Sequence, residues 1–385
     1  MPDISAPDWD RIAADFPVNN HLIWLNNCGT TPLGDPIRAR VNLWLEEYGR
    51  RGTAAEGFSY PGIKASIQRR LEALLNARPG ELALIHHTSE GMNFISHGVD
   101  MRPGDEILIL ENEYPSNVYP WEHWRAKGVA LRTVPLMANP EEFLAAFATM
   151  AGPKVRLASL SAVHWCTGMP LPLEAIGRLC AQRNIIFVVD GSQGVGLVDL
   201  DVRAAGIHYM AFSAWKWLLG PIGQGVLFVD RDRLESLKPI FKGTESVEGD
   251  YLPYKEAWKP SADRFAISTG SFTEWVYLEA SLAYLEAIGF ARVKERIRGL
   301  ATRLSDGLRG LGFRLAADAW GGGVGIVVAF REDVDAGSAV RALKAGNIIA
   351  AERMGGIRFA PHVYNTEAQI DTVIGAMRSL TDPAS

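Results

Sequence analysis

Short apolar runs alternate with longer amphipathic segments through the first two thirds of the chain. In the amphipathic segments, apolar residues recur three and four positions apart, as in IQRRLEALL at 67–75 and again at 140–150 and 173–183. Alternating helices and nearly continuous apolar strands are typical of a parallel sheet covered on both faces. The pattern therefore predicts a large doubly wound α/β unit with a mostly parallel sheet, with strands at 82–86, 106–110, 129–136, 155–160, 185–189, 209–212 and 225–229.

The last third has a different order. Two long helical patterns, at 275–288 and 291–311, precede a glycine cluster at 321–325. The pattern after that cluster predicts a small α+β domain: strand 326–330, helix 335–346, strands 348–351 and 357–360, and a helix from Thr366. The chain is thus expected to divide into an N-terminal segment at 1–30 that packs with the small domain, a large α/β domain at 31–265 and the small domain at 266–385.

Composition excludes several classes of function. The 39 basic and 44 acidic residues give a formal charge of −5, so there is no global electrostatic reason to bind nucleic acid or an anionic membrane. Cys28, Cys166 and Cys180 fit no zinc pattern and cannot form a closed disulfide framework. No metal is predicted. The polar N-terminus has no signal-peptide core and no apolar run spans a membrane, so we expect a cytoplasmic protein.

Chemically capable side chains follow several predicted strands, at the sheet edge where parallel sheets bind ligands. Thr88 and Ser89 open a helix after one strand, either as a phosphate site or simply as an N-cap. Asp190 closes another strand, where a buried carboxylate needs a partner. Lys216 lies between two tryptophans after the next strand, and Tyr114 follows a fourth. Taken alone, Lys216 would more simply be a lysine whose stem covers an apolar surface.

The combination favours pyridoxal 5′-phosphate. That cofactor needs a lysine for its aldehyde, an acid for its pyridine nitrogen, and N–H and hydroxyl groups for its phosphate. A nicotinamide-binding oxidoreductase is disfavoured because no strand is followed by a G-x-G-x-x-G helix start.

These motifs, from IWLNN at 23–27 to YNT at 364–366, resemble the class V aminotransferase family. The family includes cysteine desulfurases, selenocysteine lyases, isopenicillin N epimerases and kynureninases. The resemblance implies a pyridoxal-phosphate enzyme of fold type I, in which the large domain, 31–265, binds the cofactor and the N-terminal segment, 1–30, also packs on the active site. It implies that Lys216 holds the cofactor as an internal aldimine and moves the substrate α-proton, that Asp190 pairs with the pyridine nitrogen, and that Gln193 contacts the phenolic oxygen.

The same resemblance assigns further positions. Thr88, Ser89 and Ser213 are expected at the phosphate, and Tyr114 where desulfurases usually carry a histidine stacked on the ring. Thr269 matches a threonine that reaches the phosphate of a neighbouring subunit, which implies a homodimer with shared active sites. The substrate-side positions are expected to be Arg358 on the carboxylate, with Trp165 and Cys28 in the pocket wall.

One departure from the family bears on the reaction. Desulfurases carry a persulfide-forming cysteine in the small domain, but no cysteine follows Cys180 here. The resemblance therefore implies an enzyme acting on an amino acid through an external aldimine, as a β-eliminating C–S lyase without that cysteine. Transamination is the alternative reaction, and epimerisation is a further one. A non-catalytic relative is disfavoured because Lys216, Asp190, Gln193 and Arg358 are all present. The roles of His164 and Cys166, as chemical groups or buried structural ones, stay open.

Overall fold

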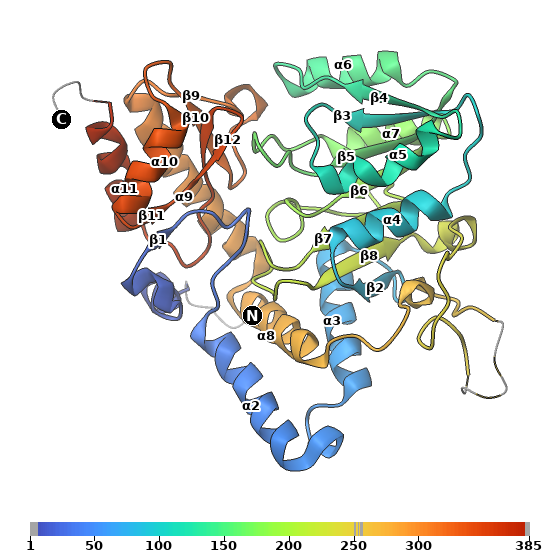
Figure 1. Cartoon of the computed structure of the whole chain (residues 1–385). Helices are drawn as coiled ribbons and strands as arrows, with labels where there is room; N and C mark the ends of the chain where they lie inside the picture. The colour runs from blue at the N-terminus through green and yellow to red at the C-terminus, as the bar shows by residue number, and fades with distance from the viewer. Residues whose placement is uncertain (1–6, 250–251, 253, 255–256, 382–385) are drawn as a thin grey trace, which may run out of the picture.

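The computed structural model describes residues 7–249, 252, 254 and 257–381; the outermost ends of the first and last predicted segments, 1–6 and 382–385, lie outside these residues. A seven-stranded sheet forms the larger part of the molecule (Figure 1), in the order β2-β8-β7-β6-β5-β3-β4. Its strands are β2 (Leu82–Ile85), β3 (Glu106–Leu110), β4 (Ala130–Val134), β5 (Val155–Ser161), β6 (Ile186–Asp190), β7 (Tyr209–Ser213) and β8 (Gly225–Val229).

Strand β8 is the only one of the seven that runs against the others. It pairs antiparallel with both β7 and β2, whereas β3 to β7 pair in parallel. The predicted mostly parallel sheet is confirmed. Because β2 to β7 share one direction, their carboxyl ends meet at a single edge, and Thr88, Tyr114, Asp190 and Lys216 lie at or just after the ends of these strands.

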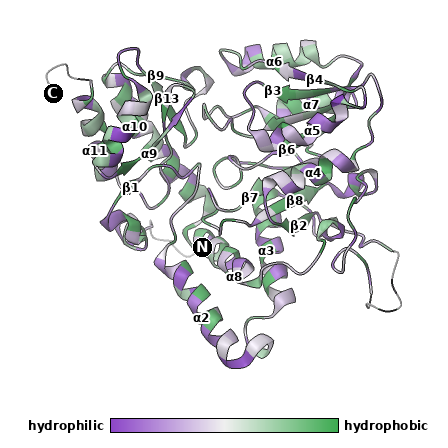
Figure 2. Ribbon diagram, viewed as in Figure 1, coloured by the Kyte–Doolittle hydropathy of each residue, from purple (hydrophilic) through white to green (hydrophobic). Residues whose placement is uncertain are grey.

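Successive residues of the buried strands point to opposite faces, so each strand feeds two cores. In β6, Phe187 and Val189 belong to one core and Val188 to the other. The central strands are accordingly mostly apolar, while the outer helices mix apolar and polar residues (Figure 2). One face carries α4 (Thr88–Gly98) and α5 (Tyr119–Arg125); the other carries α3 (Tyr60–Leu75), α6 (Pro140–Met150), α7 (Leu173–Gln182) and α8 (Phe272–Ile288).

The smaller sheet has the order β12-β13-β10-β9 and is antiparallel. Its helices share a separate apolar core with it. A two-stranded parallel pair, β1 with β11, joins the beginning of the chain to this unit. The elements are β1 (Ile23–Trp24), β9 (Arg314–Leu315), β10 (Val327–Phe330), β11 (Ile348–Ile349), β12 (Ala351–Arg353), β13 (Gly356–Phe359), α9 (Phe290–Gly310), α10 (Ala336–Ala345) and α11 (Glu367–Ser379).

Helices α1 (Trp9–Ala14) and α2 (Asp35–Arg51) complete the α-helices described. The sequence pattern did not predict α2, because only Ile37 and Trp44 of its seventeen residues are buried and little apolar periodicity results. The division at 30/31 and 265/266 stays a prediction; across the second boundary, α8 packs on α2 and α3. No helix in the described ranges is long and apolar enough to cross a membrane.

Candidate active site

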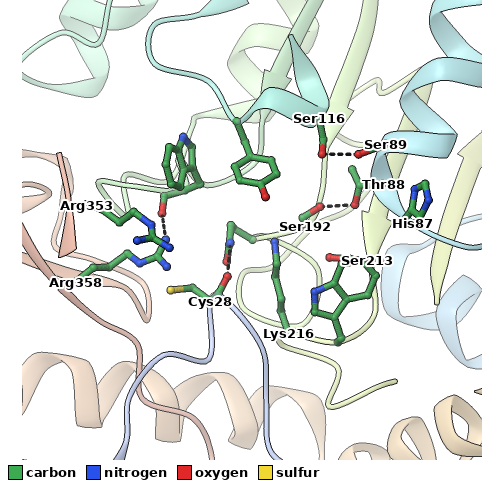
Figure 3. A pocket seen from close by; sticks show the side chains of 15 residues that line it. Cys28, His87, Thr88, Ser89, Ser116, Ser192, Ser213, Lys216, Arg353 and Arg358 are labelled. Carbon is green, nitrogen blue, oxygen red and sulfur yellow. Dashed lines mark hydrogen bonds between the residues drawn. The ribbon is translucent and has the colours of Figure 1, made fainter. Parts of the chain in front are cut away.

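A cavity of about 370 Å³ opens at the carboxyl edge of the large sheet, between that sheet and the small one. Nearly all of the predicted site residues line it (Figure 3); Asp190 and Thr269 do not. The lining consists of Cys28, Gly29, His87, Thr88, Ser89, Tyr114, Ser116, Trp165, Ser192, Gln193, Ser213, Trp215, Lys216, Arg353 and Arg358.

Lys216 lies in the middle of the cavity, on the turn after β7. The Gly220 N–H donates to the Ala214 carbonyl at 2.9 Å and closes this turn. Gly220 has no room for a side chain, because a Cβ there would lie 2.9 Å from the Ala214 oxygen. Burial lowers the pKa of the Lys216 amine, and the Asp190 carboxylate partly opposes that change. A larger fraction of the amine is therefore neutral than in an exposed lysine, which suits a nucleophilic role.

Asp190 ends β6 beneath the cavity and is 4% exposed. Its Oδ1 accepts a hydrogen bond of 2.9 Å from the Ser192 N–H. Burial raises the pKa of this carboxyl, while Ser192 and Lys216 lower it. A buried carboxylate in this position is suited to a cationic ring nitrogen, which would offset the cost of burying its charge.

One end of the cavity is a cluster of hydroxyl groups. Thr88 Oγ1 lies 2.8 Å from Ser192 Oγ, and Ser89 Oγ lies 2.7 Å from Ser116 Oγ (Figure 3). Thr88 and Ser89 are the first residues of α4, whose unpaired N–H groups and dipole favour an anion. The buried Ser213 Oγ has no hydrogen-bond partner among the described residues.

Two aromatic side chains form a wall between the two ends of the cavity. The rings of Tyr114 and Trp165 meet edge to face, with centroids 5.3 Å apart. The Trp165 indole N–H donates to the Asn112 carbonyl at 2.8 Å, which fixes the orientation of that ring. Lys216 Nζ lies 5.8 Å from the centre of the Tyr114 ring, so a flat ligand joined to the lysine would lie against the tyrosine.

Arg358, on β13, lies at the end of the cavity opposite the hydroxyls and is 2% exposed. Its Nη1 donates to the Trp165 carbonyl at 2.8 Å and its Nη2 to Asn26 Oδ1 at 3.3 Å, while its Nε has no described partner. Burial lowers its pKa from the ordinary value. A buried guanidinium bonded only to neutral acceptors is a binding group for a carboxylate.

Gln193 and Cys28 are held together beside Lys216. The Gln193 Nε2 donates to the Cys28 carbonyl, and its Oε1 accepts from the Trp217 indole N–H, each at 2.9 Å. One Nε2 hydrogen remains for a ligand, so the predicted contact with a phenolic oxygen stays a prediction. Burial raises the pKa of the Cys28 thiol, which therefore stays protonated at neutral pH.

His164 and Cys166 lie behind the wall. His164 is fully buried, with Nε2 3.1 Å from the Asn112 carbonyl and Nδ1 2.9 Å from Thr167 Oγ1, and burial lowers its pKa to about 4. Burial raises the pKa of Cys166 to about 12. Neither side chain lines the cavity, and their surroundings favour a structural role.

Thr269 does not belong to this cavity. It is exposed and lines a second one of about 300 Å³, with Tyr60, His86 and Glu274. A role toward a neighbouring subunit needs such an outward position, and that role stays a prediction. Among the described residues, no group of three or more His, Cys, Asp or Glu side chains is arranged to hold a metal.

The cavity fits pyridoxal 5′-phosphate. The orphaned Ser213 hydroxyl and the α4 N-terminus would hold the phosphate, Lys216 would bind the aldehyde carbon, and Asp190 would face the ring nitrogen. Reasoning from the sequence missed Ser116, Ser192 and Arg353. Ser192 could have been found from its place two residues after Asp190, whereas Arg353 carried no such signal.

Comparisons with known proteins identify the family. A family model described as aminotransferase class-V matches residues 23–373. The isopenicillin N epimerase of Amycolatopsis lactamdurans is 28% identical, with 97% of each chain covered. The cysteine desulfurase of Klebsiella pneumoniae subsp. pneumoniae is 28% identical over 78% of this chain and 77% of its own.

Solved structures with the same fold include the following two. A cystine C–S lyase in complex with its reaction product, cysteine persulfide, has a TM-score of 0.87 and 25% identity, with 95% of this chain and 99% of the other covered. An apo cysteine desulfurase from Thermococcus onnurineus NA1 has a TM-score of 0.86 and 22% identity, with 99% of each chain covered. The predicted fold type I architecture is confirmed. The chain belongs to the class V aminotransferase family of pyridoxal 5′-phosphate-dependent enzymes.

Proposed function

We propose that this enzyme is a β-eliminating lyase that cleaves the Cβ–S bond of a cysteine-type amino acid without passing the sulfur to an enzyme cysteine. The cofactor, when bound, supplies an electron sink for the bond-breaking step. The observation that carries the proposal is the distribution of cysteines. None follows Cys180, so the small sheet and its helices contain no thiol that could take up sulfur.

The three thiols present are poor sulfur acceptors. Burial raises the pKa of all three, to about 12 for both Cys166 and Cys180. Because the thiolate is the nucleophilic form, none of them is activated as the persulfide reaction requires.

The side chains around the cavity can divide the remaining work. Arg358 would bind the substrate carboxylate and Lys216 would take the α-proton, while Asp190 would hold positive charge on the ring nitrogen. As the α-proton leaves, the Cβ–S bond breaks and its electron pair departs on sulfur. The released enamine then reacts with water to give a 2-oxo acid and ammonia.

The test measures product without an amino acceptor. The holoenzyme is incubated with L-cystine or S-methyl-L-cysteine while pyruvate, thiol or persulfide, and the cofactor's visible band are monitored. We expect catalytic pyruvate release with a visible band that persists through turnover. Lys216→Ala should lose the activity and no longer yield a borohydride-stable adduct between cofactor and protein.

A Cys28→Ala variant is the control for the sulfur route. It should retain pyruvate release, since the Cys28 thiol lines the pocket but is not an acceptor in this reaction. Bleaching of the visible band that only an added 2-oxo acid reverses would replace the lyase with a transaminase. A sulfur-labelled peptide recovered from any cysteine would also contradict the proposal.

A further inference from the structure

The active-site cavity contains a second guanidinium, that of Arg353. Strands β12 and β13 pair so that Arg353 lies opposite Gly356 and Ala351 lies opposite Arg358. Residues opposite each other share a face of the sheet, so the two arginines are diagonal neighbours on one face, with backbones roughly 7–8 Å apart. Both side chains point toward the cavity at the end away from the hydroxyl cluster (Figure 3).

Neither arginine is neutralised by an acidic partner among the described residues. Arg353 Nη1 donates to the neighbouring Glu352 carbonyl at 2.6 Å, and the bonds of Arg358 go to neutral oxygens. No ion pair between either arginine and an Asp or Glu is found within the described ranges. The Glu352 carboxylate instead accepts from the Gly355 N–H, and Glu352 points to the other face of the strand.

Contacts with its neighbours hold Arg353 in this position. Its guanidinium carbon lies 5.9 Å from the centre of the Trp165 ring, and that ring is itself held by the Asn112 carbonyl. Its strand, β12, ends at Arg353 itself, and the next two residues, Met354 and Gly355, both have positive φ and form a tight turn into β13. Cys166 Sγ contacts Met354 Sδ at 3.0 Å, so the hairpin tip also rests on the pocket wall. The two like charges repel, which is part of the reason that the pKa of Arg358 is lowered.

Two unpaired guanidinium groups at one end of a cavity are more than a single carboxylate needs. We propose that Arg353 forms a second anion subsite, and that the preferred substrates are amino acids whose side chain also carries a carboxylate. This inference rests on the proposed function in so far as Arg358 takes the α-carboxylate. The group at Arg353 would then be the distal one, near the mouth, where Arg353 is only half-buried.

The experiment compares amino acids of equal length with and without the distal carboxylate. L-2-Aminoadipate is paired with L-norleucine, and L-glutamate with L-norvaline. None of the four carries a leaving group on Cβ. Dissociation constants are taken from the change in the holoenzyme's visible band under conditions in which no product forms. We expect the dicarboxylic member of at least one pair to bind about ten- to a hundredfold more tightly.

Variants assign this preference to Arg353. In Arg353→Gln the ratio of the two dissociation constants should fall close to one, and Arg353→Lys should restore part of it because the charge returns without the two-donor geometry. Arg341→Gln, on the exposed surface of α10, is the matched control and should keep the wild-type ratio.

Each failure has a distinct signature. A ratio near one in the wild type, or a preference that survives in Arg353→Gln, would overturn the second subsite while leaving lyase activity untouched. A dicarboxylate preference in an enzyme that releases no pyruvate from any cysteine derivative would overturn the lyase and retain the subsite. No spectral response to any amino acid would overturn both.

Discussion

Arg358 is a charged residue buried among neutral acceptors, and its geometry gives a sharp prediction. Arg358→Lys keeps the positive charge but loses the pair of parallel donors that fits a carboxylate. We expect KM for amino acids to rise about ten- to a hundredfold, which corresponds to a lost charged hydrogen bond. Steady-state kinetics of the variant measure this change.

Cofactor retention provides the control for that variant. Arg358 lies at the opposite end of the cavity from the hydroxyl cluster, so the visible band and the cofactor dissociation constant should not change. Unchanged KM in Arg358→Lys would remove the residue from the substrate site.

Sequence reasoning worked best for residues whose position depends on a strand. Asp190 ends one apolar strand and Lys216 follows the next, and the pattern predicts both strands close to their observed bounds, so the meeting of the two residues at one edge could be anticipated. Arg353 could not be, because its direction depends on the register of a hairpin that turns at Met354 and Gly355. The apolar pattern predicted one strand at 348–351, whereas the chain forms two short ones, β11 and β12.

At the scale of elements, α4 must lie close to the sheet for its N-terminus to face the cavity. A Cβ at Gly91 would lie 2.7 Å from Ala211 Cβ and 2.8 Å from Ile85 Cδ1. Gly91→Ala should therefore push the helix outward, lower the free energy of unfolding by about 1–3 kcal/mol, and weaken cofactor retention. Thermal unfolding and cofactor titration measure the two effects.

The chain offers a matched control in another helix. At Gly375, on the exposed side of α11, an added Cβ meets nothing within 4 Å. Gly375→Ala should leave the stability equal or raise it, since alanine favours a helix more than glycine does. If Gly91→Ala behaved in the same way, the close approach of α4 to the sheet would not be what sets its position.

At the scale of the whole molecule, the lowered pKa values of three histidines make the free energy of unfolding depend on pH. Burial lowers the pKa of His164 and His208 to about 4 and that of His362 to about 3. In the unfolded chain these three histidines take up protons from about pH 6.5 downward, whereas in the folded protein they stay neutral down to about pH 4. Stability should therefore fall as the pH falls through this window, by up to about 1.4 kcal/mol per pH unit for each histidine.

His208→Gln isolates one of these contributions. The His208 Nδ1 accepts from the Phe187 N–H at 2.8 Å, a bond that a glutamine oxygen can replace. Between pH 4.5 and 6, unfolding of the variant should take up about one proton fewer than unfolding of the wild type, so its unfolding free energy should depend less steeply on pH. An identical slope would show that His208 is protonated in the folded protein.

The assembly of two chains into the predicted homodimer can also be tested. Thr269 is exposed beside the second cavity, where its hydroxyl is free to reach a neighbouring molecule. Thr269→Ala should weaken cofactor binding several-fold and Thr269→Ser should restore it, as measured by cofactor titration alongside light scattering for the oligomeric state. A monomer that holds the cofactor as tightly as the wild type would contradict shared sites.

The pairings of the two sheets have a consequence for how the protein is made. Strand β2 cannot pair until β8 has been synthesised, about 140 residues later, and β1 cannot pair until β11 has been synthesised, more than 300 residues later. Cys28 comes from the start of the chain and Arg358 from near its end, yet both line one cavity. The substrate side of the pocket therefore forms only after the chain as far as Arg358 has left the ribosome, whereas the residues assigned to the chain's own cofactor are all present once Lys216 has emerged.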